Sequence, residues 1–323
     1  MIILLKNILM EREPLYGIGK WIRGFESSLM GITEEQVDHV NDDRIGRTLD
    51  VIFDSDRGSM ITEIAKRTMK NFEIGMDEFH NDSTTITFSG SYEDADGSDK
   101  GGKQSAKITY GHNKDHRPDL KQLLWTMTVS ADHSVPVHYT ALDGNTPDSE
   151  THKDTWNFIR ELCGRPDFLY VADSKLCSRD NMRYIDENHG RFITVLPATR
   201  SEVSWFHDYI ADHEIEWVDA FVKKRKKGDI EFSVFESPIP SSEEFRIIWV
   251  WSSQKEDMDS GTRDRKIRRS IKDLDELESS LKKRHMKKES VIRRAESATF
   301  NVPYVRYEIK ENKEETFRQS GRG

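Results

Sequence analysis

The sequence predicts a mixed α/β protein with a central sheet flanked by helices. Between residues 80 and 200, runs rich in β-branched and aromatic residues alternate with segments of helical periodicity. The early runs follow one another through polar links, whereas the later ones are separated by helical segments. We therefore expect antiparallel strands first and parallel strands after them.

The first region, residues 1–75, is expected to be helical. In NDDRIGRTLDVIFD, Asn41 or Asp42 suits the N-cap position, and Ile45 and Leu49 fall on one helix face. SMITEIAKRTMKNF repeats this apolar spacing. The region is expected to form a partial N-terminal helical domain.

The second region, residues 76–199, carries the expected sheet. Strands are predicted in STTITFSGSY, QSAKITYG, LLWTMTVS and VPVHYTAL, with Asp82 at the start of the first. A helix over 148–164 follows and ends at Gly164. Further on, a strand (DFLYVADS), a helix that begins after Ser178, and a last strand (RFITVLPA) are predicted.

This order of elements matches a ribonuclease H-like core. In such a core the first and fourth strands are neighbours, so carboxylates on them lie close together. Asp82 on the first strand and Asp173 at the end of DFLYVADS, the strand after the helix, which takes the place of that fourth strand, occupy those positions. The simpler alternatives are a turn residue for Asp82 and a helix-start charge for Asp173.

The third region, residues 200–323, is less regular. Strands are expected in EFSVFES and FRIIWVWSS, and a long helix over 262–295. Residues 261–300 hold 13 Lys/Arg against 7 Asp/Glu, although the whole chain of 323 residues has a net charge of −9. KKRKK at 223–227 adds a second basic cluster. This distribution permits binding to nucleic acid, but a solvated helical face has the same pattern.

Composition excludes several classes of protein. The apolar start MIILLKNILM is far shorter than the ~20 residues of a membrane span, and no signal-peptide cleavage pattern follows it. Two cysteines, Cys163 and Cys177, form no CxxC pair, so neither a disulfide framework nor a structural zinc site is expected. We expect a cytoplasmic protein without a membrane partner.

The predicted pair of carboxylates suits metal-assisted phosphoryl transfer. Carboxylates fixed on a rigid sheet can hold two Mg²⁺ ions ~4 Å apart. Magnesium prefers oxygen ligands and keeps some of its water. The basic loop YGHNKDHRPDLKQL, with Lys114, Arg117 and Lys121, and Lys175 beside Asp173 would suit contacts with phosphates.

Six blocks together resemble one family, the DDE-type transposases of bacterial and archaeal insertion sequences, which have a ribonuclease H-like core. In order along the chain they are REPLYGIGKWI, NDDRIGRTLDVIFD, HNDSTTITFSGSY, YGHNKDHRPDLKQL, ALDGNTPDSETH and YVADSKLCSRDN. The resemblance implies a metal-dependent recombinase that uses Mg²⁺ or Mn²⁺. Its partners would be the double-stranded DNA of the transposon terminal repeats and of the target, and it would act as a homodimer.

The resemblance assigns the first two catalytic carboxylates to Asp82 and Asp173. The family's third, a Glu on a helix beyond an insertion, has no counterpart, so we expect a copy shortened at both ends. Glu202 is the conveniently placed substitute, although a helix-start role also fits it. The alternatives are a defective DNA-binding or dominant-negative fragment, a partly folded remnant, and a metal-dependent nuclease of the same fold.

Overall fold

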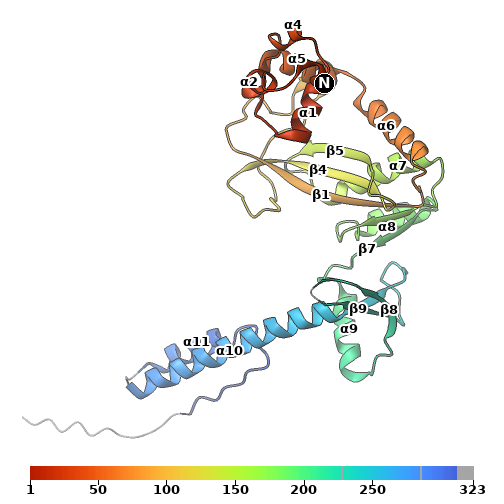
Figure 1. Cartoon of the computed structure of the whole chain (residues 1–323). Coiled ribbons are helices and arrows are strands. Elements are labelled where there is room, and N and C mark those ends of the chain that lie inside the picture. Colours follow the sequence, from red (N-terminus) through yellow and green to blue (C-terminus); the bar gives the residue numbers. More distant parts are fainter. Residues whose placement is uncertain (227, 284–285, 311–323) are drawn as a thin grey trace, which may run out of the picture. The chain divides into compact units, whose positions relative to one another are not determined.

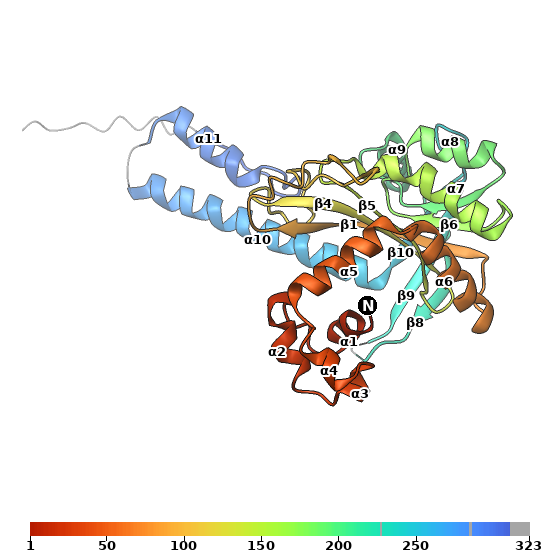
Figure 2. The same ribbon diagram turned by 90° about the horizontal axis from the view of Figure 1, so that it is seen from above.

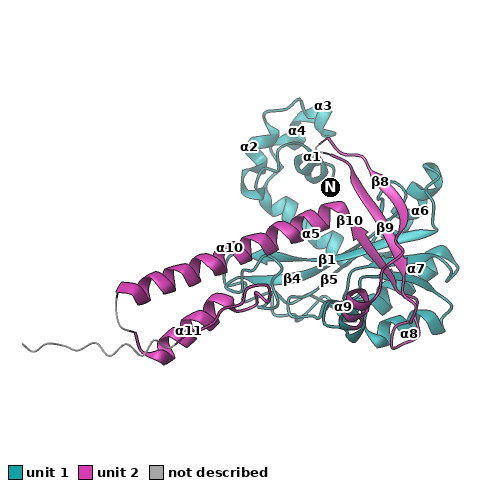
Figure 3. Cartoon of the chain, turned by 90° about the horizontal axis from the view of Figure 1, so that it is seen from below, with its two compact units in different colours: residues 1–204 teal, residues 205–323 magenta. Residues whose placement is uncertain are grey.

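A computed structural model describes residues 1–226, 228–283 and 286–310. The chain divides into two compact units, Met1–Ser204 and Trp205–Gly323, drawn in teal and magenta in Figure 3. Lys227 of the predicted KKRKK cluster lies outside the described residues. None of the described helices has the length and apolar composition needed to span a bilayer.

Unit 1 begins with a cluster of helices that has its own small core. Ile18, Ile22 and Met30 are buried in it. The Asn41 side chain accepts a hydrogen bond from the backbone N–H of Arg44, which confirms the predicted N-cap. The elements are α1 (Ile2–Met10), η1 (Leu15–Gly17), α2 (Ile18–Ile22), α3 (Ser27–Met30), α4 (Glu34–Val37), α5 (Asp42–Asp54) and α6 (Arg57–Asn71).

The centre of unit 1 is a five-stranded mixed sheet with the order β5-β4-β1-β6-β7. β1, β4 and β5 are antiparallel, whereas β6 and β7 run parallel to β1 (Figure 1). This confirms the predicted α/β class and the change from antiparallel to parallel strands. The strands are β1 (Glu78–Phe88), β4 (Lys121–Ser130), β5 (Pro136–Asp143), β6 (Leu169–Ala172) and β7 (Arg191–Thr194).

Helices cover one face of this sheet. Phe79 of β1 and Tyr170 of β6 are buried there against Trp156 of α7 (His152–Cys163). Side chains from α6 and from α8 (Arg179–Glu187) complete this core. α8 has the predicted Ser178 N-cap, and α7 ends at Gly164, whose φ of 69° suits a glycine. On the opposite face Ile86 is exposed.

Two strand predictions need correction. The first strand begins at Glu78 rather than at Ser83, so Asp82 lies inside it and not at its start. The polar residues before Asp82 suggest a turn, yet Asn81 points into the core, where its side chain accepts a hydrogen bond from Thr128 Oγ1 at 2.9 Å. QSAKITYG forms no core strand, because β1 and β5 already pair with both edges of β4 and only Thr109 bridges to it. Instead, β2 (Asp99–Lys100) and β3 (Lys103–Gln104) form a small separate hairpin.

Unit 2 consists of a three-stranded antiparallel sheet and a helical hairpin. The sheet has the order β10-β9-β8, with β8 (Val218–Lys223), β9 (Ile230–Glu236) and β10 (Ile248–Ser252). α9 (Ser201–Asp212) crosses the boundary between the units, and its Phe206 stacks on Trp249. The two strands predicted in this region are therefore found as β9 and β10.

The predicted single helix over 262–295 is wrong in its bounds. α10 begins earlier and spans Ser253–Lys283, and α11 follows as a separate helix over Lys288–Thr299. The polar start of α10 suggests a loop, but the Lys255–Asp259 ion pair supports the helix there. Figures 1 and 2 show α11 folded back along α10.

Candidate active site

The register of the sheet places Asp82 and Asp173 side by side. β1 and β6 are parallel neighbours, with Asn81 opposite Ala172. Asp82 directly follows Asn81, and Asp173 directly follows Ala172, so the two predicted carboxylates come next to each other. The structure therefore brings the two residues together from positions 91 residues apart in the sequence.

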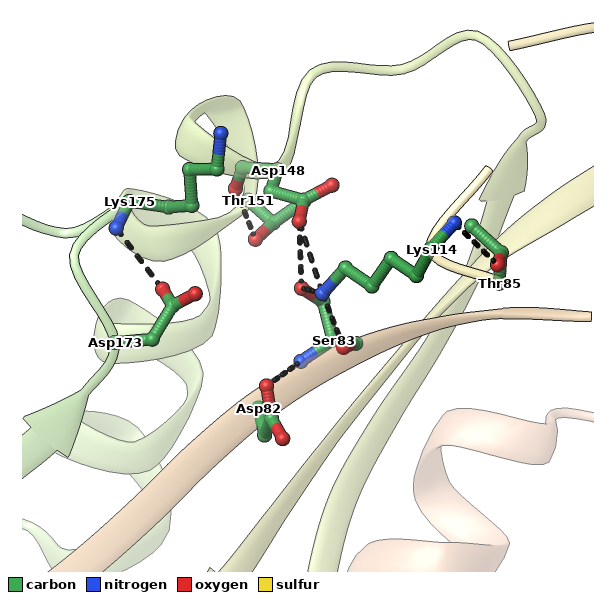
Figure 4. A network of polar contacts seen from close by, with 8 residues as sticks. All are labelled: Asp82, Ser83, Thr85, Lys114, Asp148, Thr151, Asp173 and Lys175. Carbon is green, nitrogen blue, oxygen red and sulfur yellow. Dashed lines mark hydrogen bonds and ion pairs between the residues drawn. The ribbon is translucent and has the colours of Figure 1, made fainter. Parts of the chain in front are cut away.

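Local hydrogen bonds orient each of these carboxylates. Asp82 Oδ1 accepts the backbone N–H of Ser83 at 2.8 Å, and Asp173 Oδ1 accepts that of Lys175 at 2.9 Å (Figure 4). The Asp173 backbone carbonyl also accepts the hydroxyl of Thr194 on the neighbouring strand β7 at 2.6 Å. Asp82 is exposed, so a ligand in solvent can reach it.

A second polar group lies on the other face of β1, because successive side chains of a strand point to opposite faces. Ser83 Oγ donates to Asp148 Oδ2 at 2.9 Å. Lys114 Nζ donates to Ser83 Oγ at 2.7 Å and lies 3.1 Å from Asp148 Oδ2. It also donates to the Ser83 backbone carbonyl (Figure 4). We call these three residues the Ser83–Lys114–Asp148 network.

Sequence reasoning missed Asp148 as a member of this site. It lies in η2 (Asp148–Thr151), the short turn that leads into α7, and only 15% of its side chain is exposed. The available signal was its place in the block ALDGNTPDSETH, together with a charged loop at 110–123 that needed an acidic partner. Neither signal identifies Lys114 as the residue of this loop that pairs with Asp148.

A buried histidine lies near Asp173 and Asp148. His152 is 3% exposed, and its Nδ1 lies 3.1 Å from the hydroxyl of Tyr170. Burial lowers the pKa of His152 below its ordinary value, while the negative charges of Asp173 and Asp148 act in the opposite direction. Burial also raises the pKa of Tyr170, and the charge of Asp173 adds to this effect.

The four predicted phosphate-contact residues have different surroundings. Lys114 belongs to the network, and Lys121 Nζ donates to the backbone carbonyl of Ser91. Arg117 pairs with Asp119 at 2.7 Å, which holds the pKa of that carboxyl below its ordinary value.

Lys175 lines a cavity of about 290 Å³ in unit 1. Asp148, His112 and Gln122 also line it. Lys175 is thus the cation that lies next to a predicted catalytic carboxylate and also borders an open space.

Glu202 is not placed as a free substitute for a third carboxylate. It lies in the first turn of α9, where a negative charge is favoured. It is buried, and its carboxylate is 2.7 Å from the guanidinium of Arg200. These contacts match the helix-start alternative.

The donor atoms of Asp82 and Asp173 suit a divalent cation. Mg²⁺ takes oxygen ligands and is commonly bound by one or two carboxylates together with water and substrate phosphates. Among the described residues, no group of three or more His, Cys, Asp or Glu side chains is arranged to hold a metal ion. In such a site Asp82 and Asp173 would hold the ion through their carboxylate oxygens.

Comparisons with known proteins give matches among solved structures. No protein-family model matches the sequence, and no curated protein matches it. The piggyBac transposase in its synaptic complex with hairpin DNA is 10% identical, with a TM-score of 0.39 over 78% of this chain and 50% of that chain. The Mos1 transposase in a paired-end complex with the left transposon end is 11% identical, with a TM-score of 0.24 over 62% of this chain and 70% of that chain. The chain thus spans half the length of the piggyBac transposase chain.

Proposed function

We propose that the protein is a DDE-type transposase of an insertion sequence, which cleaves DNA strands and transfers them to target DNA. The observation that carries this proposal is the adjacency of Asp82 and Asp173 on the parallel strands β1 and β6. The six sequence blocks that resemble this family support it, since they include both residues. Its partners are the DNA of the transposon ends and of the target, and pairing two ends calls for a homodimer.

Asp82 and Asp173 hold the divalent ions in this proposal, with two Mg²⁺ or Mn²⁺ ions expected. When bound, such ions activate water or a 3′-hydroxyl and stabilise the leaving oxygen of an in-line phosphoryl transfer. The backbone hydrogen bonds from Ser83 and Lys175 fix the orientation of the two carboxylates. The Lys175 side chain provides a cation for a DNA phosphate beside Asp173.

The Ser83–Lys114–Asp148 network positions Asp82. Lys114 binds both the hydroxyl and the carbonyl of Ser83, the residue next to Asp82. Asp148 neutralises this lysine at 3.1 Å. The network thereby anchors the segment of β1 that carries the first carboxylate to the turn before α7.

The second candidate is a DNA-binding protein that occupies transposon ends without cutting them. The observation in its favour is the absence, among the described residues, of a third carboxylate grouped with Asp82 and Asp173. The two candidates differ in a single measurable property, which is strand cleavage by the bound protein.

Cleavage of supercoiled plasmid DNA carrying the element's terminal repeats separates these candidates. We expect nicking by the full chain in Mg²⁺ or Mn²⁺ and none in EDTA. Asp82→Asn and Asp173→Asn should each lower the rate at least a hundredfold, about 2.7 kcal/mol of transition-state stabilisation, while DNA affinity is retained. Asp94→Asn, an exposed loop carboxylate, is the matched control and should nick like the wild type. DNA binding without nicking by the wild type would instead favour the non-cutting protein.

A further inference from the structure

α10 carries a stripe of basic residues along one face. Arg265, Arg268, Arg269 and Lys272 follow one another at spacings of three, one and three residues. At 3.6 residues per turn this spacing places all four within about a third of the helix circumference. All four are exposed. We call these residues the basic stripe.

The basic stripe lies opposite the face that packs against α11. Leu277 of α10 is buried with Val291 and Ala295 of α11, and Leu274 packs against the same cluster. Leu274 is nine residues from Arg265, which is two and a half turns, so the two residues point to opposite sides. Packing between the helices thus holds the hairpin together without using the basic stripe.

The cations of the basic stripe differ from those near the ends of α10. Lys255 pairs with Asp259 at 2.9 Å, and Lys282 pairs with Glu278 at 2.7 Å. Within the described part of the chain, Arg268 and Arg269 have no carboxylate within ion-pair distance. Their positive charge is therefore available to an external polyanion.

Two other members of the stripe have only weak internal partners. Arg265 donates to the neutral Thr262 hydroxyl at 3.1 Å and to the Gly261 carbonyl at 3.2 Å. Lys272 lies 3.8 Å from a Glu276 carboxylate oxygen, which is a long and exposed contact. Neither contact neutralises the stripe.

We propose that the basic stripe of the α10–α11 hairpin binds the phosphate backbone of duplex DNA. From Arg265 to Lys272 the helix rises about 10 Å, a length in which a duplex carries about six phosphates. The four cations of the stripe lie within that length, and exposed arginines can bind phosphate oxygens in bidentate fashion. This proposal rests on the proposed function and adds a place on unit 2 where DNA is held.

The test is the salt dependence of DNA binding by the full chain, measured in EDTA by anisotropy of a short fluorescent duplex. Two variants each remove two positive charges from α10 and leave alanine, the best helix former. Arg268→Ala/Arg269→Ala removes members of the basic stripe, and Lys255→Ala/Lys282→Ala removes ion-paired lysines. The slope of log K against log salt is negative, and loss of two phosphate contacts should reduce its magnitude by about 1.8. At 0.15 M salt this corresponds to about thirtyfold weaker binding by the stripe variant.

The control variant separates the stripe from a general effect of charge. We expect Lys255→Ala/Lys282→Ala to bind within about twofold of the wild type, because those lysines are neutralised in the helix. Equal losses in both variants, or no loss in either, would overturn the proposal. The proposal would also be overturned if the wild type bound phosphatidylserine vesicles but not duplex DNA, and the stripe variant no longer bound the vesicles.

Failure of the stripe proposal can be distinguished from failure of the proposed function. Binding in EDTA does not require cleavage, and nicking by a stripe variant can be measured at saturating DNA. An unchanged salt slope together with metal-dependent nicking that Asp82→Asn abolishes would remove the stripe proposal and leave the proposed function intact. Absence of any DNA binding by the wild type would remove both.

Discussion

Replacing Asp148 by asparagine tests how strongly the Ser83–Lys114–Asp148 network anchors β1 beside the candidate site. Asparagine keeps the shape of the side chain and can still accept from Ser83, but it removes the negative charge 3.1 Å from Lys114 Nζ. The lysine then keeps its charge in a partly buried position without an anionic partner. We expect Asp148→Asn to lower the free energy of unfolding.

The magnitude follows from the distance and the burial. Two unit charges 3.1 Å apart attract by about 5 kcal/mol at an effective dielectric constant of ~20. Desolvation of both groups and up to about 2 kcal/mol of lysine side-chain entropy offset most of this attraction. Side-chain exposures of 31% for Lys114 and 15% for Asp148 place the pair between surface and core. We therefore expect a net coupling of about 1–2 kcal/mol.

The assay is urea unfolding of the full chain in a double-mutant cycle. The cycle compares the wild type, Asp148→Asn, Lys114→Met and the double variant, and yields the coupling energy directly. The matched control is the exposed pair Lys255–Asp259, for which the same cycle should give about 0.3–0.5 kcal/mol. A coupling for Lys114 and Asp148 no larger than that of the control would refute the anchoring role.

Two further predictions concern the stability of unit 1. Gly144→Ala should destabilise the fold by about 2–3 kcal/mol, because its Cβ would lie 2.0 Å from the Gln122 backbone carbonyl oxygen. Gly46→Ala in α5 is the control and should stabilise by about 0.5–1 kcal/mol, since its Cβ meets nothing within 4 Å. Burial lowers the pKa values of His138 and His152 in the folded chain. As the pH falls below ~6.5, the unfolded chain therefore binds more protons than the folded chain does. Stability should be full above that pH and fall below it, by at most ~1.4 kcal/mol per pH unit for each histidine. Thermal unfolding between pH 7.5 and 5.5 measures this, and His152→Gln should reduce the dependence.

All five strands of the core sheet were predicted from the sequence, although QSAKITYG was wrongly added to them, because turn chemistry and helical periodicity are local signals. Asn41, Ser178 and Gly164 mark helix ends through hydrogen bonds and backbone conformations that each residue type favours by itself. The adjacency of Asp82 and Asp173 was predicted from the match of this order of elements to a ribonuclease H-like core, in which the first and fourth strands are neighbours. Whether the two residues bind metal remains a prediction.

Features that depend on tertiary partners could not be predicted in this way. Asn81 resembles a turn residue until Thr128 is known to pair with it across the sheet. Asp148 is an ordinary loop carboxylate until folding brings Lys114 to it from 34 residues earlier in the chain. The packing of α11 against α10 is likewise a tertiary feature, in which Leu277 is buried with Val291 and Ala295.

The most direct test of the shared carboxylate site is a double-mutant cycle on the rate of Mn²⁺-dependent DNA nicking. Asp82→Asn, Asp173→Asn and the double variant are compared at saturating DNA. In the proposed site the two residues act as one unit on the same ions, so each single variant should lose nearly all activity and the double variant should lose little more. Wild-type nicking rates in either single variant, or losses that multiply in the double variant, would contradict a shared site.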